Sequence, residues 1–303
     1  MAKTIKKESL FSMVTVNYNR SNDLSQLLDS LSRQTMKGFE VVVVDNASRD
    51  DSLQMVQQNY PEVKIISLKE NTGVTGFNIG VENATFKYSV LLDNDVILPP
   101  NFVEQLYETV NAYPDFTVFA LNIITPDGIR QKDYLPQHAS TPMSWHNFIG
   151  GGAVFLTSVY KELGGYDPNY FIYINETELS ARLLLAGKKI LYCPHIKLIH
   201  KTSSAGRMAE VSYFYFMRNS LLFMRTYFKL SKAINLTIGF LLINLKGAVR
   251  QKLLKTYIKA VFEASKVDSS RPPVRKLDGG LEKVFSSSWQ GDPSLSSILA
   301  RKL

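Results

Sequence analysis

The stretch "VLLDNDVILPPNF" (Val90–Phe102) decides how the chain is organised, because it joins a buried strand to a helix through two acids. Its apolar start predicts a strand covered on both faces, and Pro100 suits the first turn of the following helix. Asp93 and Asp95 stand between them. Paired carboxylates at this point fit a loop cap, a calcium loop, a catalytic pair or a site for a metal that carries phosphates.

Similar strand–loop–helix units surround this stretch. The segments "SMVTVNYN" (12–19), "FEVVVVDNAS" (39–48) and "VKIISL" (63–68) have strand patterns, and each is followed by a helical pattern. Alternation of this length predicts a parallel sheet in an α/β layer fold. The alternation ends near Phe116. We therefore expect an α/β protein with a mostly parallel central sheet, flanking helices and a C-terminal helical extension.

Composition and charge predict how the chain is divided. Of 303 residues, 45% are apolar and 20% charged, which is ordinary for a globular protein. Residues 1–200 hold 17 Lys/Arg and 21 Asp/Glu, whereas residues 201–303 hold 18 and 6, so the net charges are −4 and +12. We predict a first domain over 1–205, a basic amphipathic helical region over 206–265 and a loosely structured tail over 266–303.

The numbers of cysteines and histidines and the length of the most apolar run limit the possible classes of protein. A single cysteine, Cys193, cannot form an internal disulfide, and four histidines without a Cys-x-x-Cys argue against structural zinc. The apolar run Ile234–Leu245 has 12 residues, which is too short to span a bilayer. We expect a cytoplasmic protein whose basic region lies at the inner face of the plasma membrane. No nucleic-acid motif accompanies the charge, so nucleic acid is not an expected partner.

Polar residues collect where the predicted strands end. Asn17 ends the first strand, Asp45 the second and Asn71 the third, and the pair Asp93 and Asp95 ends the fourth. In open α/β sheets, ligands bind beyond the carboxyl ends of the strands. Each residue alone is equally explained as a turn or cap former, but four strand ends together favour a binding site.

Three familiar motifs are excluded, two that bind phosphates and one that binds calcium. Gly73, Gly76 and Gly80 are spaced G-x-x-G-x-x-x-G, which is neither the dinucleotide fingerprint nor a P-loop. The segment is either a tight turn or a backbone that approaches a diphosphate. Counting from Asp93, the sixth residue is Leu98 rather than the glycine of an EF-hand. Mg²⁺ or Mn²⁺ suits the acid pair better, since carboxylates and phosphates commonly hold such ions.

Two later features carry further candidates. In "YFIYINETELSARL", Glu176 follows an aromatic run at a helix start, where it either complements the helix dipole or acts as a general base. Glu178 is expected to complement the dipole or face solvent. In "CPHIKLIHK", His195 and His200 follow a strand, and imidazole tolerates Mn²⁺ as a partner.

The ordered set "VTVNYNR", "VVVVDNASRDDS", "NTGVTGFNIGVENA", "LLDNDVILPPNF", "GGAVFL", "GGYDPNYFIYINETELSARLLLAGKKI" and "IHK" resembles bacterial family 2 glycosyltransferases. The likeness is strongest to the rhamnosyltransferase-like branch and runs from about Ser12 to Lys201. It implies a GT-A fold, with a Rossmann-like nucleotide-binding sheet. It also implies inverting transfer of a sugar, rhamnose by preference, from a dTDP- or UDP-linked donor to a glycan or polyprenyl-diphosphate-linked acceptor.

The resemblance also implies roles for the donor side of the site. Asn17 takes the position that lines the base pocket, and Asp45 that of the aspartate reading the pyrimidine. The loop near the nucleotide is matched by Asn71, Gly73 and Asn78.

The same resemblance implies roles for the metal and acceptor side. Asp95 matches the ligand of Mn²⁺ or Mg²⁺, with Asp93 near the ribose or a metal-bound water, and His200 reaches the metal or the diphosphate. Gly151 and Gly152 match the floor of the acceptor site.

One departure affects the catalytic residue. Relatives have Glu-Asp where this chain has Asn175-Glu176, so Glu176 takes the place of the catalytic aspartate with one more methylene. This departure leaves open an inactive GT-A scaffold in a polysaccharide assembly complex. A sugar-nucleotide nucleotidyltransferase is a second alternative, because it also uses paired acids on an α/β sheet, but it usually has a glycine-rich loop that carries Arg or Lys. The nucleotidyltransferase loop would follow the first strand, where "VNYNRSNDL" contains no glycine.

The basic region also fits a homodimer contact.

Overall fold

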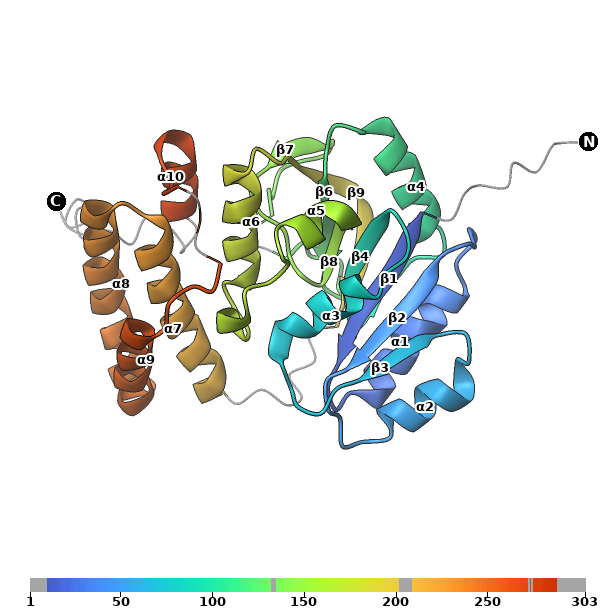
Figure 1. The fold of residues 1–303 in the computed structure, drawn as a ribbon, viewed down its shortest axis with the longest axis horizontal. Helices are drawn as coiled ribbons and strands as arrows, with labels where there is room; N and C mark the ends of the chain where they lie inside the picture. The colour runs from blue at the N-terminus through green and yellow to red at the C-terminus, as the bar shows by residue number, and fades with distance from the viewer. Residues whose placement is uncertain (1–9, 132–134, 202–208, 272, 274, 288–303) are drawn as a thin grey trace, which may run out of the picture. The chain divides into compact units, whose positions relative to one another are not determined.

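The computed structural model describes residues 10–131, 135–201, 209–271, 273 and 275–287 (Figure 1). The chain forms two compact units, each built from two pieces of sequence. Unit 1 comprises Met1–Gly165 and Lys188–Ser203, and unit 2 comprises Tyr166–Gly187 and Ser204–Leu303. The sequence prediction had placed all of 1–205 in one domain, whereas Tyr166–Gly187 groups with the C-terminal helices.

Unit 1 is built on a nine-stranded mixed sheet. Its strands are β1 (Phe11–Asn17), β2 (Glu40–Asp45), β3 (Lys64–Ser67), β4 (Tyr88–Asp93), β5 (Val96–Ile97), β6 (Val118–Ile124), β7 (Met143–Trp145), β8 (Gly152–Leu156) and β9 (Ile190–His200). The order is β3-β2-β1-β4-β8-β6-β9-β5, with β7 paired to β9. The first four are parallel, β8 is antiparallel to β4 and β6, and β5 and β7 are antiparallel to β9. Strands β6 and β9 are also parallel, so the expected parallel pairing holds throughout the N-terminal half of the sheet and for one pair in the other half.

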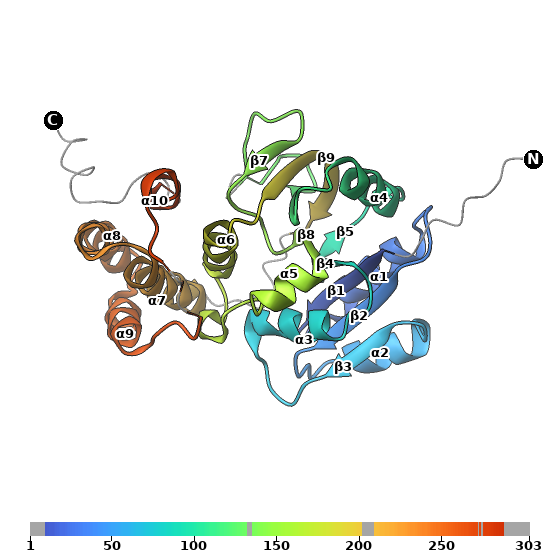
Figure 2. The same ribbon diagram turned by 45° about the horizontal axis from the view of Figure 1, so that its top comes forward.

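Helices flank this sheet (Figures 1 and 2). They are α1 (Ser21–Ser32), α2 (Ser52–Asn59), η1 (Gly73–Thr75), α3 (Gly76–Glu82), α4 (Phe102–Ala112) and α5 (Thr157–Glu162). Local sequence explains them, since the four leucines of α1 recur at helical spacing and are all buried. Helix α3 packs on β1 and β2, and α4 packs on β9. The run Val42–Val44 in β2 is fully buried, as expected of a strand covered on both faces.

Unit 2 is helical. It contains η2 (Pro168–Tyr170), α6 (Asn175–Leu185), α7 (Ala209–Tyr227), α8 (Leu230–Arg250), α9 (Leu254–Lys266) and α10 (Gly279–Ser286). Tyr170, Ile174 and Ala181 share one apolar core with α7 residues such as Phe223, which explains why the α6 segment folds with these helices. Helix α10 lies within 266–303, the part predicted to be a loosely structured tail, and its Phe285 is fully buried in the same core.

A buried ion pair lies inside unit 2. Glu178 is fully buried, which excludes the solvent-facing alternative of the sequence expectation. Its carboxylate accepts hydrogen bonds from Arg182 Nε at 2.7 Å, Arg182 Nη2 at 2.6 Å and the Tyr227 hydroxyl at 2.6 Å. A buried charge needs such partners, because an uncompensated one is strongly destabilising. The pair therefore links α6 to α7 within this unit.

Gly80 of α3 gives a packing prediction. A Cβ there would lie 2.3 Å from Val14 Cγ1 and 3.2 Å from Val44 Cγ2, so α3 cannot approach the sheet this closely with a larger residue. We expect Gly80→Ala to lower the free energy of unfolding by about 1–3 kcal/mol. In Gly247→Ala, where the nearest atom is Gln251 Nε2 at 4.0 Å, the change is neutral or stabilising by up to about 1 kcal/mol. Urea unfolding checks both, and equal losses would contradict the packing argument.

Candidate functional site

Three strand ends meet at one edge of the unit 1 sheet. The parallel register pairs Asn17 with Asp45 and Val16 with Asp93, so the ends of β1, β2 and β4 lie side by side. Asn17 is fully buried and Asp45 almost so. The predicted convergence of polar strand ends is therefore present for these three strands.

A cluster of two acids and one histidine occupies this edge. Short β5 pairs antiparallel with the end of β9, and Val96 lies opposite His200. His200 Nε2 is 3.1 Å from Asp95 Oδ1 and 3.7 Å from Asp93 Oδ2. One possible ligand atom from each of the three residues lies within 4.8 Å of the others. His195, in contrast, pairs with Thr109 Oγ1 at 2.9 Å.

Two cationic residues that the sequence argument did not single out also lie here. Arg20 Nη1 is 2.8 Å from Asp95 Oδ2, and Lys201 Nζ is 2.5 Å from Asp23 Oδ1. Burial opposes ionisation of Asp95, but its hydrogen bond and charge interactions with His200 and Arg20 lower its pKa to about 2. The Asp95 side chain therefore stays a carboxylate throughout the physiological pH range. Arg20 directly follows the polar end of the first predicted strand, and this position is the sequence feature that could have marked it as a site residue.

The donor set fits a hard or borderline divalent ion. Carboxylate oxygens suit Mg²⁺ and Mn²⁺, and imidazole nitrogen is acceptable to Mn²⁺. Both oxygens of Asp95 already have partners, Arg20 on one and the His200 imidazole on the other. A bound ion would take the place of one of these partners. Three protein ligands leave room for water and phosphate oxygens in an octahedral shell.

Beside the cluster, Asp45 offers an unused acceptor. Its Oδ2 accepts a hydrogen bond from the Ser48 backbone N–H at 3.1 Å. Its Oδ1 is buried and has no hydrogen-bond partner among the described residues. Buried polar atoms are rarely left unsatisfied, so an orphaned acceptor at a strand end suggests a ligand that donates to it.

Amide side chains fix the edge around Asp45. Asn94 Nδ2 donates to Asn17 Oδ1 at 2.7 Å, and Asn17 Nδ2 donates to Ser48 Oγ at 3.3 Å. Asn94 was not predicted, although it stands between the two acids of the quoted stretch. These amides hold the ends of β1 and β4 and the loop after β2 together.

The glycine-containing loop is ordered by two further amides. Asn71 Oδ1 accepts from Asn46 Nδ2 and from the Gly73 N–H, both at 2.9 Å, and Gly73 adopts φ of +62°. Asn78, in α3, accepts a hydrogen bond from the Tyr160 hydroxyl at 2.8 Å. Asn71, Gly73 and Asn78 thus have visible internal roles, beside the nucleotide role that the family resemblance implies.

The two predicted acceptor-side glycines face different surroundings. A Cβ on Gly151 would lie 2.7 Å from Asp93 Oδ2, so the glycine leaves room for that carboxylate. A Cβ on Gly152 would instead lie 2.6 Å from Leu198 Cδ2, within the apolar packing of β8. Gly151 therefore borders the acid cluster, and Gly152 borders the core.

Glu176 lies in the first turn of α6, in unit 2. The two residues before this helix, Tyr173 and Ile174, adopt φ of +65° and +63°, which is uncommon for residues other than glycine and costs free energy. Asn219 of α7 holds this turn, because its Nδ2 donates to the carbonyls of Ile172 at 2.7 Å and Tyr173 at 2.9 Å. A strained, tightly held turn before an acidic residue is a common functional arrangement.

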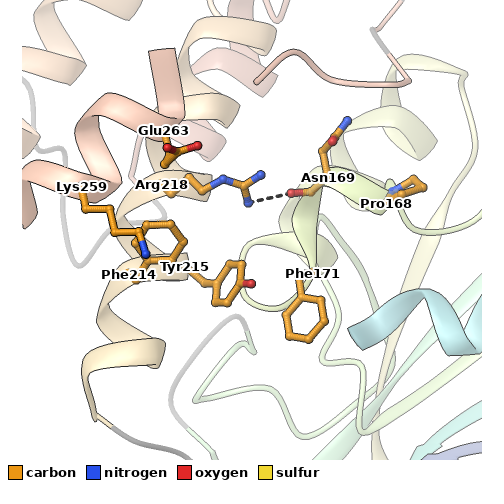
Figure 3. A pocket seen from close by; sticks show the side chains of 8 residues that line it. All are labelled: Pro168, Asn169, Phe171, Phe214, Tyr215, Arg218, Lys259 and Glu263. Atoms are coloured by element: carbon orange, nitrogen blue, oxygen red, sulfur yellow. Dashed lines mark hydrogen bonds between the residues drawn. The ribbon is translucent and has the colours of Figure 1, made fainter. Parts of the chain in front are cut away.

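Unit 2 also contains an open hollow of about 320 Å³ (Figure 3). It is lined by Pro168, Asn169, Phe171, Phe214, Tyr215, Arg218, Lys259 and Glu263. The Phe171 and Tyr215 rings stack at 5.1 Å, and Lys259 Nζ lies 5.3 Å from the Phe214 ring centre. Arg218 Nη1 donates to the Asn169 carbonyl at 2.8 Å (Figure 3). Aromatic faces beside cations suit a sugar or an anionic group.

Comparison with known proteins gives a consistent result. The family model for glycosyl transferase family 2 matches residues 12–164. An uncharacterized glycosyltransferase of Bacillus subtilis, YwdF, is 28% identical over 173 residues, which is 54% of this chain and 63% of that protein. The matched part is thus less than two thirds of that relative. The N-acetylglucosaminyl-diphospho-decaprenol L-rhamnosyltransferase of Mycobacterium tuberculosis is 25% identical over 239 residues, covering 64% of this chain and 77% of the relative.

Solved structures show the same fold. The S. aureus TarS fragment 1–349 in complex with UDP-GlcNAc has a TM-score of 0.61 at 15% identity, over 84% of this chain and 80% of that one. GalNAc-T7 with UDP, GalNAc and Mn²⁺ has a TM-score of 0.60 at 17% identity, over 84% and 55%. Both are GT-A glycosyltransferases, so the GT-A fold expected from the sequence is confirmed.

Gly151 and Gly152 form a matched pair for testing the acid cluster. In Gly151→Ala the new methyl group would displace the Asp93 carboxylate, so we expect Mn²⁺ affinity measured by calorimetry to fall by about tenfold or more. Gly152→Ala would overpack the core and lower stability by about 1–3 kcal/mol, with little change in Mn²⁺ affinity of the folded protein. The cluster interpretation is wrong if both variants bind Mn²⁺ like the wild type.

Proposed function

The chain belongs to glycosyl transferase family 2, and on this premise we propose that it moves a sugar from a nucleotide-diphosphate donor to a glycan or lipid-linked acceptor in cell-surface polysaccharide synthesis. One observation carries the proposal: the Asp93, Asp95 and His200 cluster stands on the same sheet edge as the orphaned Asp45 acceptor. A diphosphate and a base with an N–H donor match these two features.

The donor is proposed to be dTDP- or UDP-linked. Uracil and thymine both carry an N–H that can donate to Asp45 Oδ1, and Asn17 supports the same edge from β1. Asn71, Gly73 and Asn78 order the adjoining loop. Rhamnose is our first choice of sugar, because the Mycobacterium tuberculosis relative is named a rhamnosyltransferase.

Asp95 and His200 would hold Mn²⁺ or Mg²⁺, with Asp93 as their supporting carboxylate. A bound ion would neutralise charge on the diphosphate. Arg20 would help in the same way once a diphosphate oxygen accepts the hydrogen bond that it now gives to Asp95. The cationic side chains thus favour a dianionic leaving group at this edge of the sheet.

Glu176 is the proposed general base. Its carboxylate takes the proton from the acceptor hydroxyl as the hydroxyl oxygen bonds to the anomeric carbon. The bond from that carbon to the diphosphate oxygen breaks on the opposite face, and the diphosphate leaves with the electron pair. One displacement inverts the anomeric configuration, and no covalent enzyme intermediate is needed.

Each unit, taken by itself, offers candidate residues for binding the acceptor. Gly151 and Gly152 take the family position at the acceptor floor in unit 1. In unit 2, the hollow beside Phe171 and Tyr215 has aromatic faces on which a sugar ring can pack, and Arg218 and Lys259 suit a phosphate. A polyprenyl-diphosphate-linked acceptor would place the protein at the inner face of the plasma membrane.

A screen of nucleotide sugars tests the function directly. With Mn²⁺ or Mg²⁺ present, we expect binding and transfer or hydrolysis with a dTDP- or UDP-sugar. Asp95→Asn should lower metal-dependent donor affinity by about tenfold or more, since it removes a ligand charge. The matched control, Asp115→Asn, changes an exposed acid of the same unit and should leave affinity unchanged. Normal donor and metal binding by Asp95→Asn would contradict the site assignment.

Kinetics of Glu176 variants test the proposed base. Glu176→Gln keeps the size of the side chain but loses its basicity, so we expect kcat to fall by about 10²–10⁴-fold while donor binding persists. Glu176→Asp, which restores the residue that relatives have here, should retain more activity than the Gln variant. Full transfer by Glu176→Gln would show that another group takes the proton. A wild-type protein that binds donors but transfers nothing would instead support the scaffold alternative.

A further inference from the structure

We propose that helices α8 and α9 carry a docking surface for an anionic lipid bilayer, formed by an exposed apolar stripe on each helix and by the cations beside them. The inference deepens the proposed membrane location, but it rests on the exposed surface of unit 2 and not on the transferase site. Its test therefore succeeds or fails separately from sugar transfer.

Helix α8 is apolar on two opposite faces. One face is buried against the rest of unit 2 through Leu236 and Phe240. The opposite face carries large apolar residues that are between 39% and 77% exposed: Leu230, Ile234, Ile238, Leu242, Leu245 and Val249. At about 100° per residue these positions fall within an arc of about 120°. A single exposed leucine is ordinary, whereas a continuous stripe this long marks an interaction surface.

Helix α9 continues the pattern. Leu254, Ile258 and Phe262 recur every four residues and are 42%, 59% and 57% exposed. The buried positions of α9, such as Ala260, lie on the opposite side of the helix. Helices α8 and α9 both pack on α7 and contact each other, and the Tyr257 hydroxyl donates to the Leu241 carbonyl. Each stripe lies opposite the buried face of its own helix, so both face outward from the helical core of unit 2.

The charges beside this surface point to its occupant. Residues 229–266 contain eight Lys or Arg and one acid, Glu263, for a net charge of +7. On the helical wheel, Lys246 borders one side of the stripe of α8, and Lys255 borders one side of that of α9. Apolar residues beside a cationic border match an anionic leaflet, where apolar groups enter the interface and cations meet headgroups. A second copy facing the same surface would bring like charges together.

The same helix invites a different interpretation. Among the described residues, α8 is the one helix that is long and apolar enough to cross a membrane. Spanning would remove Leu236 and Phe240 from the apolar core that they share with α7. The observed packing therefore favours a helix that lies on the bilayer and keeps its inner face on the protein.

Vesicle sedimentation of the full-length protein tests the proposal. We expect binding to phosphatidylcholine vesicles with about 30% phosphatidylglycerol to exceed binding to pure phosphatidylcholine by about tenfold, and to weaken with salt. Ile258→Gln with Phe262→Gln should reduce binding about tenfold or more, because two apolar anchors are lost. Ile129→Gln, an exposed apolar residue of unit 1, serves as the control. Ile234→Gln with Leu242→Gln repeats the test on α8 if the first pair fails to fold.

Three results would overturn the proposal. One is wild-type binding to anionic vesicles by both folded double variants. Another is a dimer in light scattering that the variants abolish, in a protein that binds no vesicles, since the surface would then be covered by a second copy. The third is resistance of vesicle-bound protein to high salt and alkaline carbonate, which would indicate a spanning α8.

Discussion

The fold depends on the requirement that parallel neighbours end at the same edge of a sheet. Because Asn17 pairs with Asp45 and Val16 with Asp93, the polar ends of three strands must lie next to one another. Such crowding of acids is unfavourable unless cations are near, and Arg20 and Lys201 supply them, while the His200 imidazole lies against Asp95. The same edge that would hold an anionic ligand is thus kept together by ion pairs while none is bound.

Local patterns made much of unit 1 predictable. The valine run of β2 and the leucine spacing of α1 identify a buried strand and an amphipathic helix from a few residues each. The meeting of the polar strand ends follows from the parallel order of the strands. The position of His200 next to Asp95 depends on the pairing of β5 with β9, across more than a hundred residues. The sequence pattern proposed His195 and His200 alike, and only the family resemblance singled out His200. Arg20 and Lys201 lie in loops, where charge has no period that could be recognised.

Unit 2 shows where sequence patterns mislead. An acid in a first turn ordinarily faces water, yet Glu178 is buried because Arg182 and Tyr227 meet it from α6 and α7. The basic, apolar helices predicted a membrane contact, but only the packed structure separates the inner face of α8 from its exposed face. The family model ends at residue 164, one residue before unit 1 gives way to unit 2. Beyond residue 164, functional roles are inferred from individual contacts in the structure.

The interleaving of the two units has a consequence for the order in which the protein matures on the ribosome. The turn that precedes Glu176 is held by Asn219 of α7, and Asp167 accepts hydrogen bonds from Ser269 and Ser270, about a hundred residues later. These partners emerge from the ribosome long after α6 itself. A nascent chain can therefore form the early strands of its sheet before the turn at Glu176 acquires the support of Asn219. Until α7 has emerged, that turn would lack the hydrogen bonds that hold its two left-handed residues.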